Sequence, residues 1–144
     1  MGQIRSYLEI MESAFTNTSH GEMYRKLLKH GKEYSVEDVE KFGKTKYDVR
    51  QRQCFRNSAL LALYERNVSY VQGFYLTSGI PLTMEHAFNL KGARIIDTTA
   101  EKFGIPVDEY FGIEIPSDFL RSYFEEHPLK PVDMILNCYL ETLE

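Results

Sequence analysis

Tryptophan is absent from this chain of 144 residues, and cysteine occurs only twice. Cys54 and Cys138 cannot form the dense disulfide framework of a small secreted domain, which favours a reducing, cytoplasmic location. No apolar run approaches the ~20 residues that span a bilayer. Charges at Arg5, Glu9 and Glu12 interrupt the only apolar segment near the N-terminus. We therefore expect neither a membrane segment nor a signal peptide.

A strong excess of positive charge is also missing. The net charge is −4, so a general nucleic-acid binder is not expected, although a lysine-rich stretch leaves local binding open (Lys26, Lys29, Lys32, Lys44 and Lys46). Hydrophobic residues make up 43% and charged residues 26%, as in ordinary globular proteins. The length fits a single domain over residues 1–144.

Periodicity and breakers divide this domain into three parts. Residues 1–50 read as helical, residues 51–116 as a candidate catalytic core, and residues 117–144 as C-terminal helices. Helices followed by clustered antiparallel strands predict an α+β fold, with helices packed on a small antiparallel sheet. The expected helices are 3–15, 22–30, a turn or two over 36–42, 54–66, 98–103 as a short helix or loop, 117–124 and one from 131; the expected strands are 68–76, 86–90, 93–97 and a short edge strand over 113–116.

Three residues of the central part have the chemistry of a catalytic triad. Cys54 opens the predicted helix 54–66, His86 begins one strand and Asp97 ends the next. The free N–H groups and the dipole of a helix N-terminus stabilise a thiolate, and the same groups can hold an oxyanion. A histidine and an aspartate on paired strands of a hairpin can supply the base and the group that orients it.

Each of these residues also has an ordinary structural interpretation. A free cysteine is commonly a buried small hydrophobe, a lone histidine is usually structural, and Asp97 could cap the turn that follows it. Weaker candidates for holding an oxyanion or substrate are Gln51, Gln53 and Asn57, of which Asn57 could instead brace the loop. A zinc site of Cys54, His86 and Cys138 or His127 lacks any paired-ligand spacing.

The segments QCFRNS, EHAFN and IIDTT resemble those of the transglutaminase-like and papain-like cysteine enzymes. In those families a cysteine opens a helix packed on an antiparallel sheet, and a histidine and an aspartate follow on adjacent strands. The resemblance covers about a third of the chain and implies that Cys54 is the nucleophile, His86 the base and Asp97 the orienting acid. Thr98 stands where proline is common, and the gaps between the three residues are short.

The sequence therefore predicts a cysteine-dependent hydrolase or acyltransferase that acts on an amide, isopeptide or ester bond. Such an enzyme needs no cofactor and no metal. Its expected substrate is a peptide or small amide, or a protein that carries one. The alternative from a different class is a non-enzymatic protein-interaction module on the same scaffold.

Overall fold

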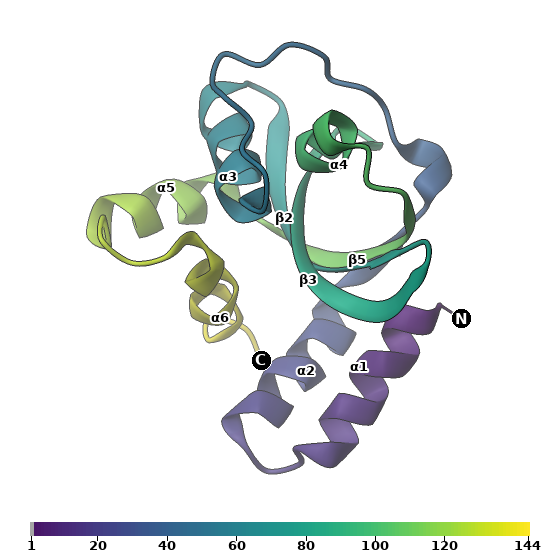
Figure 1. Ribbon diagram of the computed structural model, residues 1–144. Coiled ribbons are helices and arrows are strands. Elements are labelled where there is room, and N and C mark those ends of the chain that lie inside the picture. Colours follow the sequence, from purple (N-terminus) through teal and green to yellow (C-terminus); the bar gives the residue numbers. More distant parts are fainter. Residues whose placement is uncertain (1) are drawn as a thin grey trace.

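The computed structural model describes residues 2–144 and has the predicted α+β architecture. A single five-stranded antiparallel sheet, in the order β1-β5-β2-β3-β4, curls strongly, and helices pack around it (Figure 1). The strands are β1 (Lys32–Tyr34), β2 (Val68–Thr77), β3 (Ile80–Lys91), β4 (Arg94–Ile96) and β5 (Val107–Ile115). The α-helices are α1 (Gln3–Ala14), α2 (Ser19–His30), α3 (Cys54–Tyr64), α4 (Thr98–Phe103), α5 (Ser117–Glu126) and α6 (Ile135–Leu140), with 3₁₀ turns η1 (Val36–Asp38) and η2 (Val132–Met134).

The strand β3 is longer than the sequence predicts. It begins at Ile80 and not at His86, because Ser78 and Gly79 alone turn the chain between β2 and β3. Gly79 has a positive φ of 81°, which a side chain would disfavour. The segment interpreted as a loop around Pro81 is therefore strand.

The predicted short edge strand over 113–116 is also wrong, because residues 113–115 belong to the longer internal strand β5. The strand β5 runs over nine residues and lies between β1 and β2 in the sheet. The edge beyond it is formed by the three residues of β1, a strand that the sequence pattern does not predict. Gly73 of β2 faces Gly112 of β5, and a Cβ at Gly73 would lie 2.2 Å from the Phe111 carbonyl oxygen. The two glycines thus allow the backbones of β2 and β5 to approach closely at this pair.

Helices cover the sheet through separate apolar clusters. Ile4 and Leu8 of α1 and Leu27 of α2 pack with Phe74 and Phe111 of the sheet. Ala59 and Ala62 of α3 pack with Tyr70 and Ala87, and α5 and α6 complete that cluster through Leu120, Tyr123 and Ile135. The helices α1, α2, α3 and α5 all lie close to their predicted positions because their apolar residues recur at helical spacing.

The predicted helical turns over 36–42 shorten to η1, which Ser35 caps by accepting a hydrogen bond from the Glu37 N–H. The chain then runs without regular structure until α3 and is held by tertiary contacts. One of these is the carboxylate of Glu101, which accepts hydrogen bonds from the N–H groups of Phe42 and Gly43.

The end of the sheet near α4 is open along β3. The strand β4 pairs with β3 only over Asn89–Lys91, so at His86 no further strand lies beside β3 in the described chain. The helix α3 contacts both β3 and α4. This arrangement brings together the start of α3, the part of β3 that carries His86, and Asp97, the residue that follows β4. Among residues 2–144, no helix is long and apolar enough to cross a bilayer.

Candidate active site

Cys54 is the first residue of α3, as the sequence predicts, and its side chain is partly exposed. The N-cap residue Gln53 makes no side-chain hydrogen bond to the first turn. Because the first N–H groups of a helix have no partner within the helix, those of α3 are free to stabilise negative charge. The preceding Arg52 has a left-handed φ of 61°, an uncommon conformation for a residue other than glycine.

His86 and Asp97 form a direct hydrogen bond inside the protein. The imidazole Nε2 lies 2.8 Å from the Asp97 Oδ2, and both side chains are 2% exposed. Since a carboxylate only accepts hydrogen bonds, Nε2 is the donor. The second carboxylate oxygen, Oδ1, accepts a hydrogen bond from the Ala100 N–H and so caps α4. Asp97 therefore fills both roles considered for it, helix cap and histidine partner.

Two tyrosines hold the His86–Asp97 pair in place, and no sequence motif identifies them as part of the site. The Tyr110 hydroxyl donates to Asp97 Oδ2 at 2.8 Å. The Tyr75 ring stacks on the imidazole, with ring centroids 3.9 Å apart and planes 10° apart. Both residues belong to an aromatic-rich set of strand residues whose ordinary interpretation is core packing. Their positions opposite each other in the β2–β5 register place them beside His86.

The pair is charged in its stable state. Burial lowers the pKa of His86, but the charge and hydrogen bond of Asp97, with a further contribution from Cys54, outweigh burial and raise that pKa from 6.5 to about 9. Burial raises the pKa of Asp97, yet His86, the Ala100 N–H and the Tyr110 hydroxyl together hold it below its ordinary value. At neutral pH the site therefore holds an imidazolium bound to a carboxylate.

The thiol of Cys54 lies beside this imidazolium. Cys54 lies close enough to the ring to contribute to the raised pKa of His86, after Asp97. The contact is looser than the bond to Asp97, because no hydrogen bond of standard geometry joins the sulfur to the ring among residues 2–144. Nε2 is committed to Asp97, so Nδ1 is the ring nitrogen left for the sulfur. The three predicted side chains thus come together, although Cys54 and Asp97 are 43 positions apart in the sequence.

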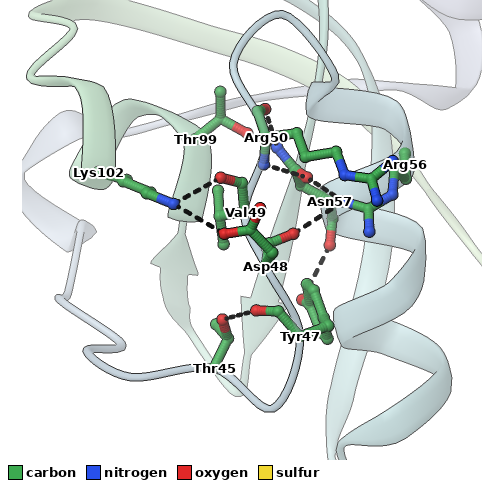
Figure 2. A network of polar contacts seen from close by, with 9 residues as sticks. All are labelled: Thr45, Tyr47, Asp48, Val49, Arg50, Arg56, Asn57, Thr99 and Lys102. Atoms are coloured by element: carbon green, nitrogen blue, oxygen red, sulfur yellow. Dashed lines mark hydrogen bonds and ion pairs between the residues drawn. The ribbon is translucent and has the colours of Figure 1, made fainter.

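The loop that leads to Cys54 is fastened by Asn57, one turn into α3. Its Oδ1 accepts from the Arg50 N–H at 3.1 Å, and its Nδ2 donates to the Arg50 carbonyl at 2.8 Å and to Thr99 Oγ1 at 2.9 Å. Figure 2 shows the loop with Asn57 of α3 on one side and Lys102 of α4 on the other, where Lys102 donates to the Asp48 carboxylate and the Val49 carbonyl. Asn57 is fully buried.

These contacts decide between the two roles that the sequence left open for Asn57. Both of its amide hydrogens are used, so none remains for an oxyanion, and the side chain braces the loop. Gln51 and Gln53 are exposed, and neither side chain makes a hydrogen bond within the described chain. Their role in holding substrate stays a prediction.

The other cysteine takes no part in the site. Cys138 lies on α6, is partly buried and packs against the cluster that contains Ala59 and Tyr70. No group of three or more histidine, cysteine, aspartate or glutamate residues has metal-binding geometry in the described part of the chain. No protein-family model, curated protein or solved structure matches this chain.

Proposed function

We propose that this protein is a cysteine-dependent hydrolase or acyltransferase that acts on an amide or ester carbonyl through Cys54, His86 and Asp97. One observation carries the proposal: a buried imidazolium, bound to a carboxylate, lies beside a cysteine at an uncapped helix N-terminus. The order of these elements, with the cysteine helix followed by strands that carry the histidine and aspartate, supports a transglutaminase-like or papain-like core.

The chemistry follows from the charges. The imidazolium of His86 holds the Cys54 sulfur as a thiolate, which attacks the carbonyl carbon. The N–H groups at the start of α3 stabilise the resulting oxyanion. As the carbon–nitrogen or carbon–oxygen bond breaks, His86 gives its proton to the leaving group and a thioester remains on Cys54. The neutral imidazole then takes a proton from water or from an amine, which attacks the thioester and releases the thiolate.

Asp97 and the two tyrosines serve this cycle without touching the substrate carbonyl. Asp97 keeps the imidazole in one orientation and stabilises its charged form, and Tyr110 keeps Asp97 in place. Tyr75 covers one face of the ring. We therefore assign all three as positioning residues.

The test is the rate of Cys54 alkylation by iodoacetamide from pH 4 to 10, read by mass spectrometry at each cysteine. We expect Cys54 to react much faster than Cys138 at pH 6, and His86→Gln to remove most of that advantage. Cys54→Ser shows the background, and Cys138→Ser shows that the second thiol is not needed. A Cys54 that is no more reactive than Cys138, and unaffected by His86→Gln, would contradict the proposal and favour the interaction module.

A further inference from the structure

The free edge of β3 leads directly to the candidate active site. The strand extends from Ile80 to Lys91, but β4 pairs with it only over Asn89–Lys91. Over residues 80–85 the backbone therefore has a strand partner, β2, on one side only in the described chain. An edge strand presents unpaired N–H and C=O groups that can bind another extended chain.

Two features distinguish this edge from a protected one. It is long, since six residues at about 3.3 Å each give roughly 20 Å of open backbone. It also carries large apolar side chains that face solvent, with Leu82 63% and Met84 43% exposed. Natural edges are usually short, or carry charged residues and proline. This edge contains Pro81 and the exposed Glu85, but its length and the exposed Leu82 and Met84 still favour a binding surface.

The apolar side chains are aligned with the catalytic histidine. Side chains alternate between the faces of a strand, so Leu82, Met84 and His86 lie on one side of β3. Met84 pairs with Tyr75 in the β2–β3 register, and Tyr75 stacks on His86. The exposed side chains of β3 thus lead through Tyr75 to the buried imidazole of His86.

We propose that the substrate is an extended peptide that adds a strand to the free edge of β3, with apolar side chains at alternate positions against Leu82 and Met84. Backbone hydrogen bonds give the affinity, and the alternate side chains give the selectivity. This binding mode delivers a main-chain or side-chain carbonyl to Cys54 at the end of the strand. This inference rests on the proposed function only in that Cys54 is expected to attack the carbonyl; the binding of the peptide does not depend on it.

Binding is tested on Cys54→Ala, which cannot form a thioester. The probe is a fluorescein-labelled hexapeptide of alternating valine and threonine, followed by fluorescence anisotropy. We expect binding that weakens at least tenfold when alternate amides of the peptide are N-methylated, because methylation removes the donors that pair with an edge strand. Adding Met84→Lys should weaken binding of the unmodified peptide similarly, while Ile10→Lys, at an exposed apolar position on α1, should not.

Three results would overturn this inference: no binding of the unmodified peptide, equal binding of the N-methylated one, or equal effects of Met84→Lys and Ile10→Lys. Sedimentation of the protein without peptide tests whether the edge pairs with a second copy of the chain instead. A concentration-dependent dimer that Met84→Lys abolishes would show that the edge pairs with a second copy. Peptide binding with an inert Cys54 would refute the proposed function alone, and a reactive Cys54 without peptide binding would refute this inference alone.

Discussion

Replacing Asp97 by asparagine should remove most of the proton affinity of His86. The aspartate is the main group that raises the pKa of this histidine to about 9, against burial, which lowers it. Asparagine keeps the shape of the side chain but not its charge. We therefore expect the pKa of His86 in Asp97→Asn to fall below 6.5, leaving a neutral ring and a thiol without its counter-charge at neutral pH.

The raised pKa of His86 also determines how much stability Asp97→Asn should lose. One pKa unit corresponds to about 1.4 kcal/mol, so a rise from 6.5 to about 9 contributes about 3 kcal/mol to the free energy of unfolding. Because the folded-state pKa of His86 is raised, this contribution is fully present below pH 6.5 and is lost as the pH rises through 9. The gap between wild type and Asp97→Asn should therefore be about 3 kcal/mol at pH 6 and much smaller at pH 10.

Urea unfolding at several pH values measures this gap, and NMR titration of the imidazole, assigned with His86→Gln, measures the pKa of His86. Tyr110→Phe is the matched control, since it removes one hydrogen bond to Asp97 and should cost about 1 kcal/mol. Tyr110 lowers the pKa of Asp97, so its contribution is lost only in acid and its cost should be similar at pH 6 and pH 9. A wild-type His86 that titrates near 6.5, or a gap for Asp97→Asn that does not change with pH, would refute the reasoning.

Three further substitutions test how the site is built. Asn57→Ala leaves the loop partners of a buried amide unpaired, so urea unfolding should show a loss of about 3 kcal/mol and hydrogen exchange should show faster exchange at the Arg50 amide. Gly73→Ala places a Cβ against the Phe111 carbonyl and should cost about 3 kcal/mol in the same assay, and a loss below 0.5 kcal/mol would contradict the close approach. Tyr75→Ala should cost more than about 1 kcal/mol, because it removes the stacking on His86 and also the packing of the ring against the cluster around Phe88, whereas Tyr75→Phe should retain both; equal losses would show that stacking is not the cause.

The local elements that carry the site were predictable because short-range patterns specify them. The apolar spacing of 54–66 marks α3 and places Cys54 at its start. The β-branched and aromatic run from Val68 marks β2, and Gly92 marks the turn before β4, although that turn consists of Gly92 and Ala93 and not of Lys91 and Gly92.

The start of β3 was predicted wrongly because the two-residue Ser78-Gly79 turn was interpreted as part of a longer loop. The first part of β5 and the whole of β1 were missed because their pairing partners are distant in the sequence. A short segment of sequence does not specify which strand it pairs with or in which register.

The sequence by itself determined which chemical groups are available and which helix or strand each one occupies. Only the tertiary structure decided that Asp97 meets His86, that Tyr110 and Tyr75 fix the pair, and that Asn57 braces the loop instead of facing substrate. The reason is physical: helix starts and turns depend on contacts within a few residues, whereas the charge of a buried imidazole depends on groups that chain folding gathers from β2, β4 and β5. The proton affinity of His86 is therefore a property of the packed sheet.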